Sequence, residues 1–137
     1  MREFKLSTSR RDEFVDITGS VREAVAGSGV ADGVCHVFVP HTTAAVTINE
    51  GADPAVTLDI IRKLDKTFPW SDGYTHAEGN SAAHLKTSLI GSSETILVED
   101  GDLVLGTWQA VYFCEFDGPR TRKFLVGVGE IRMGDLR

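Results

Sequence analysis

Alternation of apolar and polar positions marks much of the chain as β-strand. Residues 3–8 alternate with Phe4 and Leu6 on one side, as expected for a strand with one buried face. The same pattern predicts strands, in chain order, at 3–8, 14–17, 34–49, 95–98, 103–105, 107–116 and 123–131. Glycine- and aspartate-containing turns separate the later strands, which favours antiparallel neighbours.

The first helical stretch follows the second predicted strand. Thr18 is a suitable N-cap, because its hydroxyl can accept a hydrogen bond from a free N–H of the first turn. An apolar face then recurs at Val21, Ala24 and Val25. Gly27 and Gly29 follow and are expected to end the helix, because glycine readily adopts the left-handed conformation found at helix ends. We expect a short helix with one buried face.

Two further helices are predicted in the middle of the chain. Asp53 and Pro54 make a favourable start for the first, since aspartate caps free N–H groups and proline fits the first turn. Pro69 ends it. Asn80 is a candidate cap for the second, which ends at Gly91. Short helices among strands joined by tight turns indicate an α+β fold with a mainly antiparallel sheet.

The long β segment at 34–49 is interrupted by Pro40. A central strand tolerates proline poorly, because proline has no N–H to donate to the ladder. We therefore expect a bulge or a bend at Pro40. His41, Thr42 and Thr43 follow directly, so a polar cluster is expected at this bend.

Composition limits the class of protein. The 137 residues suit one compact domain, 1–137, that can bury a core without disulfides or a structural metal. The net charge of −6 argues against nucleic-acid binding, since the basic residues are scattered. No apolar run approaches the roughly 20 residues of a membrane span. The first ten residues do not resemble a signal peptide, so we expect a cytoplasmic protein.

The two cysteines, Cys35 and Cys114, lie inside apolar runs that are predicted as strands. Paired cysteines at metal-binding spacing are absent from the sequence. Both side chains are therefore expected as buried, free thiols of a reducing compartment.

Candidate chemistry gathers in three segments, of which the first surrounds His41. Thr42 and Thr43 follow it, and Asn49 and Glu50 end the same β segment. Threonine and asparagine often satisfy local backbone groups at strand ends, so a structural role is one interpretation. A functional role is the other, because proline places the histidine at a bend outside the ladder.

The second segment contains His76, Asn80, His84, Lys86 and Ser88. Two histidines and an asparagine near a helix start are able to bind a metal or an anion. The alternative is an exposed loop histidine beside a helix cap. None of the recognised zinc-site spacings occurs here.

The third segment runs from Gly106 to Arg120. In a strand, Gln109 and Glu115 share one face with the aliphatic and aromatic residues between them. Such a face either borders water at a sheet edge or lines a pocket with polar groups. Arg120 follows in a turn, where a guanidinium can clamp a carboxylate or phosphate.

Together these segments closely resemble the YjbQ-like family, also described as secondary thiamine-phosphate synthase enzymes. The resemblance covers most of the chain, roughly 4–130, and several motifs occur in order. They are Pro40-His41-Thr42-Thr43-Ala44, Ile48-Asn49-Glu50, the Asn80 to Lys86 stretch with His84, Gly106-Thr107-Trp108-Gln109, and Phe113-Cys114-Glu115-Phe116-Asp117-Gly118-Pro119-Arg120. The motif that begins at Gly106 also includes Ser93, Ile96, Val98 and Gly101 before it and Val111 after it.

The resemblance implies a compact α+β fold that assembles as a homotrimer, with sites near these motifs and between subunits. It also implies an activity of the thiamine-phosphate synthase type, which joins a pyrimidine diphosphate to a thiazole phosphate. The sequence has neither a glycine-rich phosphate loop nor an aspartate-rich magnesium motif. The two hypotheses are therefore an enzyme acting on a small phosphorylated, anionic substrate and a non-catalytic metal- or metabolite-binding protein that uses the same pocket.

Each candidate residue receives an expected role. The catalytic candidates are His41, His84 and Glu115. The substrate-binding candidates are Thr42, Thr43, Asn49, Lys86, Gln109 and Arg120. The candidate ligands of a divalent metal, Zn²⁺ or Mg²⁺, are His41, His76 and His84. We expect His41, His84 and Arg120 to converge on one anion-binding pocket, within one chain or across a subunit boundary.

Overall fold

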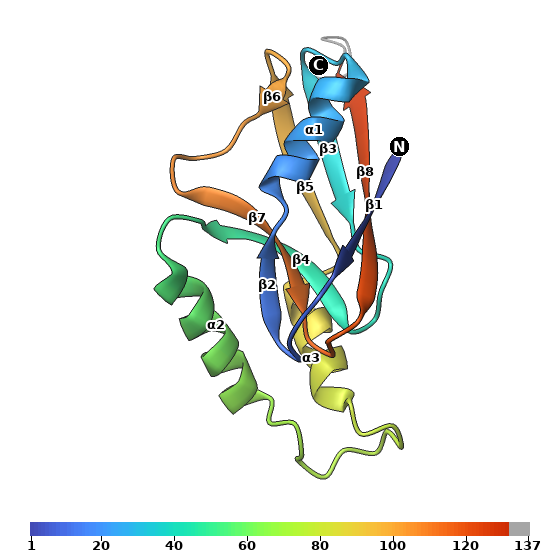
Figure 1. The fold of residues 1–137 in the computed structure, drawn as a ribbon, viewed down its shortest axis with the longest axis vertical. Helices are drawn as coiled ribbons and strands as arrows, with labels where there is room; N and C mark the ends of the chain where they lie inside the picture. Colours follow the sequence, from blue (N-terminus) through green and yellow to red (C-terminus); the bar gives the residue numbers. More distant parts are fainter. Residues whose placement is uncertain (132–137) are drawn as a thin grey trace.

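The computed structural model of the protein describes residues 1–131 (Figure 1). Its strands are β1 (Arg2–Ser7), β2 (Glu13–Asp16), β3 (Gly33–Phe38), β4 (Ala44–Glu50), β5 (Ser93–Glu99), β6 (Asp102–Leu103), β7 (Gln109–Glu115) and β8 (Thr121–Glu130). Its helices are α1 (Thr18–Ser28), α2 (Pro54–Thr67) and α3 (Ser81–Ile90). The strand pairs are antiparallel, so the predicted α+β class is confirmed.

The strands form two sheets. The larger has the order β1-β8-β3-β5-β6, and the smaller has the order β2-β7-β4. The predicted β segment at 34–49 is thus divided between them, because β3 belongs to the larger sheet and β4 to the smaller. Pro40 lies in the connection, and the expected interruption is a bend that carries the chain from one sheet to the other.

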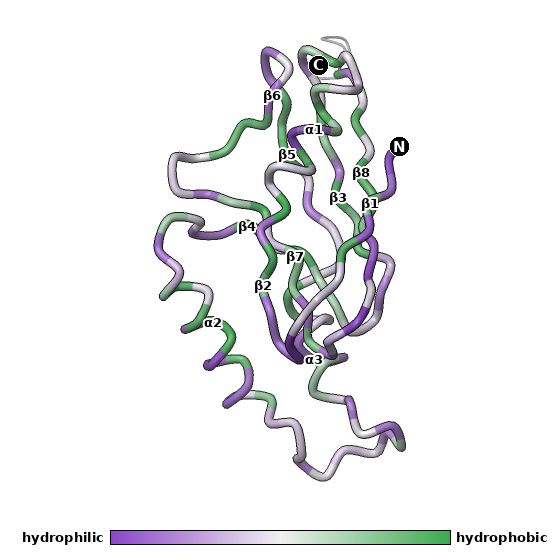
Figure 2. The backbone as a smooth tube through the Cα atoms, viewed as in Figure 1, coloured by the Kyte–Doolittle hydropathy of each residue, from purple (hydrophilic) through white to green (hydrophobic). Residues whose placement is uncertain are grey.

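The main core lies between the two sheets and is closed by α1. Val21 and Val25 of α1 pack there with Val37 of β3 and Phe113 of β7, all almost without exposure. A second cluster on the other face of the smaller sheet joins Ala83 of α3 to Tyr112 and Cys114 of β7. Strand β7 is therefore covered on both faces, and Figure 2 shows its hydrophobic character.

Two expected helix caps behave differently in the structure. Asp53 accepts the N–H of Ala55, as predicted. Thr18 is wrong as an N-cap: it is the first residue of α1, and its hydroxyl accepts the N–H of Val111 instead. Asn80 occupies the N-cap position of α3 without a capping hydrogen bond, since its amide donates to Asp117. In both cases the side chain bonds to a distant segment instead of capping its own helix, because the helix end docks against that segment.

Three connections between the sheets meet at one end of the molecule. Ser7 pairs with Thr121, while Glu13 and Ala44 both pair with Glu115. The segments 8–12, 39–43 and 116–120, which follow or precede these residues, are therefore neighbours (Figure 1). Backbone contacts join them, because Thr8 donates to the oxygen of Arg120 and Phe116 donates to the oxygen of Thr43. This end carries the first candidate site.

Candidate functional site

A pocket of about 520 Å³ opens among these connections. Its lining residues are Phe38, Val39, Pro40, His41, Thr42, Thr43, Ser92, Arg120 and Arg122. The lining contains two guanidinium groups, one imidazole and hydroxyl groups, and it contains no carboxylate. The lining is therefore rich in hydrogen-bond donors, and the carboxylates that pair with the two guanidinium groups, Asp117 and Glu115, lie outside it. We refer to it as the cationic pocket.

His41 is held at the wall of the cationic pocket by backbone contacts. Its Nε2 lies 3.1 Å from both the backbone nitrogen and the backbone oxygen of Lys123. The ring meets Phe113 edge-on, with 6.4 Å between ring centroids. Burial lowers the pKa of His41, and the positive charge of Arg122 lowers it further. When Nε2 accepts the N–H of Lys123, the proton of the neutral ring resides on Nδ1.

Arg120 is fixed by its own turn. Its Nε donates to the backbone oxygen of Asp117 at 2.9 Å, and its Nη2 donates to the Asp117 carboxylate at 3.0 Å. The same carboxylate accepts the amide of Asn80 at 3.0 Å, which ties the turn to the start of α3. The side chain of Arg120 is 48% exposed, so guanidinium donors remain available to a ligand.

Arg122 forms the buried floor of the cationic pocket. Its Nε donates to both carboxylate oxygens of Glu115, at 2.9 and 3.1 Å, and its Nη2 donates to Oε2 as well. The Nη2 also reaches the hydroxyl of Thr43 at 2.8 Å. The side chains of Arg122 and Glu115 are 3% and 0% exposed. A guanidinium charge is thus held rigidly beneath the pocket.

Glu115 has more partners than this arginine alone. The hydroxyl of Thr8 donates to it at 2.7 Å, and the N–H groups of Phe116 and Asp117 donate at 3.1 Å each. Burial by itself would raise the pKa of Glu115, but the hydrogen bonds from Arg122 and Thr8 outweigh burial and hold the pKa below its usual value. The carboxylate, expected from the sequence as a catalytic group, has no exposed surface for a ligand to touch.

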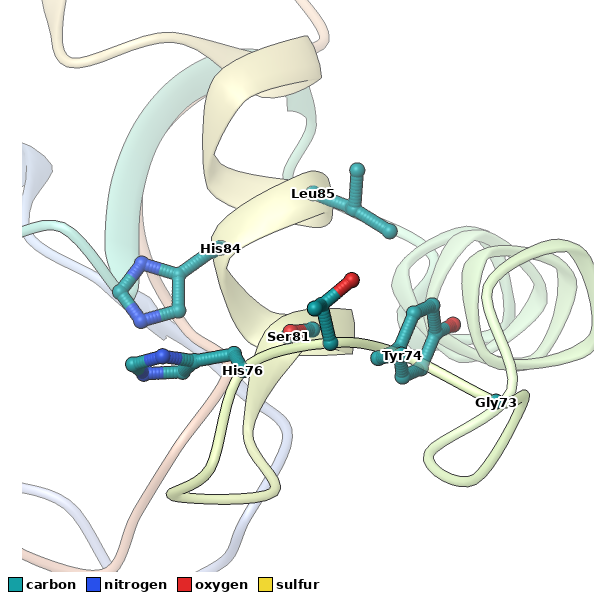
Figure 3. Close-up of a pocket in the computed structure, with 7 residues that line it drawn as sticks. Gly73, Tyr74, His76, Ser81, His84 and Leu85 are labelled. Atoms are coloured by element: carbon teal, nitrogen blue, oxygen red, sulfur yellow. The ribbon is translucent and has the colours of Figure 1, made fainter.

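His76 and His84 lie in a different pocket, of about 600 Å³. Figure 3 shows the two imidazoles side by side, on the side of α3 away from Tyr74 and Leu85. Their ring centroids are 5.4 Å apart and the rings are nearly perpendicular, at 86°. His76 comes from the loop before α3 and His84 from the first turns of that helix. We refer to this place as the imidazole pocket.

Lys86 belongs to neither pocket. Its side chain is 1% exposed, and Nζ lies 3.1 Å from carboxylate oxygens of both Asp12 and Asp65. Arg11 contacts the same two aspartates and lies over the ring of Trp70. The expected substrate-binding lysine is thus enclosed in a charge network that ties α2 and α3 to the 8–12 connection.

Asn49 and Gln109 lie at the opposite end of β4 and β7 from the cationic pocket. The residue after Asn49 pairs with Gln109, whereas Ala44 pairs with Glu115 at the other end. The side-chain oxygen of Asn49 accepts the N–H of Glu50, and that of Gln109 accepts the N–H of Gly106. Both expected substrate-binding side chains therefore accept hydrogen bonds from nearby backbone N–H groups, as the interpretation of strand-end polar groups predicts for Asn49.

Within one chain, the structure brings together part of the expected set. His41, Thr42, Thr43 and Arg120 line the cationic pocket, whereas His84 faces His76 in the imidazole pocket. Convergence of all three predicted centres in a single chain is therefore not observed, and convergence across a subunit boundary stays a prediction. The 131 described residues gather no group of three or more histidine, cysteine or acidic side chains suited to a metal ion.

Arg122 is the important pocket residue that sequence reasoning missed. The alternation of β8 already indicated that Arg122 is buried. Arg122 lies two and four positions before Phe124 and Val126, so it shares their buried face of the strand. An arginine on the inward face of a strand requires a buried partner. Glu115, on the inward face of β7, was the carboxylate available to pair with it.

Three comparisons with known proteins bear on the family. The family model described as UPF0047 protein YjbQ-like matches residues 2–130. A UPF0047 protein of Methanocaldococcus jannaschii is 50% identical over 125 residues, which is 91% of each chain. The UPF0047 protein YugU of Bacillus subtilis is 48% identical over 123 residues, which is 89% of this chain and 93% of that protein.

Solved structures agree with these matches. The crystal structure of an uncharacterised conserved YjbQ/UPF0047 protein from Clostridium acetobutylicum shares 57% identity, with a TM-score of 0.93 over 94% of this chain and 100% of that one. A protein of unknown function from Sulfolobus solfataricus, described as YbjQ-like, shares 35% identity, with a TM-score of 0.91 over 95% and 96% of the two chains. None of the helices in residues 1–131 is long and apolar enough to cross a membrane.

Proposed function

The chain belongs to the YjbQ-like UPF0047 family, and we propose that the protein is an enzyme that acts on a small phosphorylated substrate in the cationic pocket. The observation that carries the proposal is the lining of this pocket, with Arg120 accessible, Arg122 beneath it, His41 at the wall and no carboxylate among the residues that form it. Phosphate groups prefer such fixed guanidinium donors.

Each side chain has a role that its contacts support. Arg120 binds phosphate oxygens directly, because its half-exposed guanidinium has free donors beyond those used by Asp117. The exposed hydroxyl of Thr42 adds a further donor at the rim. Arg122 acts from the floor through its charge, and Glu115 positions it. His41 binds in its neutral form near neutral pH, because its pKa is lowered, and donates from Nδ1 to a ligand oxygen.

The resemblance to secondary thiamine-phosphate synthases supplies the reaction type. In that reaction the ring nitrogen of a thiazole phosphate attacks the methylene carbon of a pyrimidine diphosphate. A C–N bond forms, the C–O bond to diphosphate breaks, and the diphosphate leaves with the electron pair. Fixed positive charge that meets the leaving group as its charge develops is the usual way a protein lowers such a barrier. Arg120 and Arg122 are the groups that supply it here.

The alternative is a non-catalytic protein that binds a metabolite or a metal. The observation that favours it is the pairing of two imidazoles in the imidazole pocket, where the ring centroids of His76 and His84 lie 5.4 Å apart. Such a protein would bind an anion in the cationic pocket without turning it over.

Two measurements separate the alternatives. Purified protein is given the pyrimidine diphosphate and the thiazole phosphate, and release of inorganic diphosphate is followed. Binding of inorganic diphosphate is measured separately by calorimetry. An enzyme releases diphosphate with turnover, and His41→Ala lowers the rate by about 10²–10³-fold, the usual cost of removing one hydrogen-bond donor to a developing negative charge, while retaining most of the diphosphate binding.

His36→Ala is the matched control, since His36 is exposed on β3 and bonds to Thr95 instead of lining the cationic pocket. It leaves rate and binding unchanged. Binding of diphosphate without turnover on any phosphorylated pair would favour the non-catalytic alternative. Absence of both binding and turnover would remove the proposal.

A further inference from the structure

The imidazole pocket holds two histidines whose arrangement has no role in the function proposed above. We propose that His76 and His84 together chelate a Zn²⁺ ion, with the remaining coordination positions open to water or to a small ligand. This site excludes His41, which bonds to the backbone of Lys123 in the cationic pocket.

The spacing of the two rings fits a shared ion. Two imidazole nitrogens bound to one tetrahedral zinc at about 2 Å place the ring centroids roughly 5 Å apart. The observed separation is 5.4 Å. The rings are nearly perpendicular, at 86°, and in this arrangement each ring can direct a nitrogen toward a point between them. Figure 3 shows His76 reaching this place from the loop and His84 from the helix.

Both imidazoles are available to a metal. Among residues 1–131, no hydrogen bond engages the ring nitrogens of either histidine. The acidic residue Glu78 lies close to His76, with Oε2 3.9 Å from Nε2, and its side chain is 75% exposed. That distance is too long for a hydrogen bond, so it leaves the ring nitrogen of His76 available to an ion.

The backbone holds the two histidines in place before any ion arrives. His84 belongs to α3, and the two residues before it in this helix, Ala82 and Ala83, are fully buried. The loop that carries His76 is fastened by the hydroxyl of Tyr74, which donates to the oxygen of Pro69 at 2.6 Å, and by Gly79, whose N–H donates to the oxygen of His76. Pre-ordered ligands reduce the entropy lost on binding.

Ligand chemistry decides between the two expected metals. Imidazole nitrogen suits Zn²⁺, whereas Mg²⁺ prefers oxygen ligands and retains its waters. The lining of the imidazole pocket otherwise offers hydroxyl groups, from Tyr74, Thr75 and Ser81, and no cysteine. A zinc ion with two imidazole ligands keeps positions open for water or a small ligand, and an open position is the feature that distinguishes catalytic from structural zinc sites.

The test is zinc binding by the full chain without a polyhistidine tag. Calorimetry with ZnCl₂ and the visible spectrum of the Co²⁺ form report one site per chain in the native protein. His76→Ala and His84→Ala each weaken zinc binding at least about tenfold, the loss that even an outer partner of a metal ligand causes. His36→Ala and His41→Ala leave it unchanged, and circular dichroism verifies that every variant is folded.

Failure of this inference is separable from failure of the proposed function, since the first is measured as metal binding and the second as turnover and diphosphate binding. Loss of zinc binding in His41→Ala would overturn the inference, because the site would then depend on a histidine that lies outside the imidazole pocket. Unchanged zinc affinity in both His76→Ala and His84→Ala, or no saturable binding by the native chain, would overturn the inference.

Discussion

Arg122 of β8 and Glu115 of β7 form an ion pair that is sealed inside the protein, with side-chain exposures of 3% and 0%. Removing one partner of a buried pair leaves an uncompensated charge and costs about 3–5 kcal/mol. Glu115→Gln should therefore lower the free energy of unfolding by roughly that amount, measured by urea denaturation. Glu99→Gln, at an exposed position of β5, should change it little. Equal stability of the two variants would contradict a structural role for the pair.

The same pair gives the protein a defined acid sensitivity. The pKa of Glu115 is lower in the folded protein than in the unfolded chain, so the folded state binds fewer protons there. This contribution to stability is present above the usual glutamate pKa and is lost as the pH falls through the lowered value. Denaturation midpoints measured below about pH 4.5 should therefore decrease more steeply for the native protein than for Glu115→Gln. Parallel pH profiles would show that other carboxylates dominate.

Arg120 should contribute directly to anion binding. Arg120→Ala is expected to weaken phosphate or diphosphate binding by about 1.5–3 kcal/mol, the range for a hydrogen bond to a charged group. Its exposed side chain predicts little change in folding stability. Arg62→Ala, on the exposed surface of α2, is the control for a general loss of positive charge. Equal weakening by both substitutions would argue that the anion is attracted without a specific site.

The two cysteines should be unreactive in the folded protein. Both are free and buried, and burial raises the pKa of Cys35 to about 11 and that of Cys114 further still. Since the thiolate is the reactive species, thiol reagents should react slowly with the native protein. Titration of the denatured, unreduced protein should then find two thiol groups. Finding fewer would indicate that oxidation occurs despite the separate positions of the two residues.

A homotrimer is expected from the family resemblance, and exposed apolar side chains of the larger sheet support it. Phe38 and Leu97 are 45% and 57% exposed, and Phe38 pairs with Leu125 across the sheet. Covering such a surface is a common reason for association. Light scattering should report three chains at micromolar concentration, and Leu97→Lys should shift the mass toward one chain. Leu89→Lys, at a leucine of α3 that is 65% exposed, tests whether the effect is specific. A monomeric native protein would contradict the expectation.

Much of the fold follows from local pattern. Alternation located the strands to within a few residues, Asp53 and Pro54 marked the start of α2, and Gly29 ended α1 in a left-handed conformation. Pro40 marked the passage between sheets because a residue without an N–H cannot continue a central ladder. These features depend on residues close together in the chain, and the sequence records them directly.

The grouping of the site residues was less predictable. Of the three residues expected to converge, His41 and Arg120 line one pocket, whereas His84 lies in another within the same chain. Lys86 was expected at a binding surface, yet two aspartates from other elements enclose it. A lysine on a helix face has the same local pattern in either case. Only the docking of α2 and of the 8–12 connection decides whether such a lysine is enclosed or exposed.

The sequence by itself determined the periodicity of each element, the identity of the inward-facing residues and the inventory of histidines, arginines and hydroxyls available for chemistry. The tertiary structure decided which of them meet. Thr8 and Glu115 bond across 107 positions of the chain, and His41 reaches the backbone of Lys123 across 82. Such contacts depend on how the two sheets pack and on the register between strands. A short stretch of sequence specifies neither, because the free energy of long-range pairing is set by the whole core.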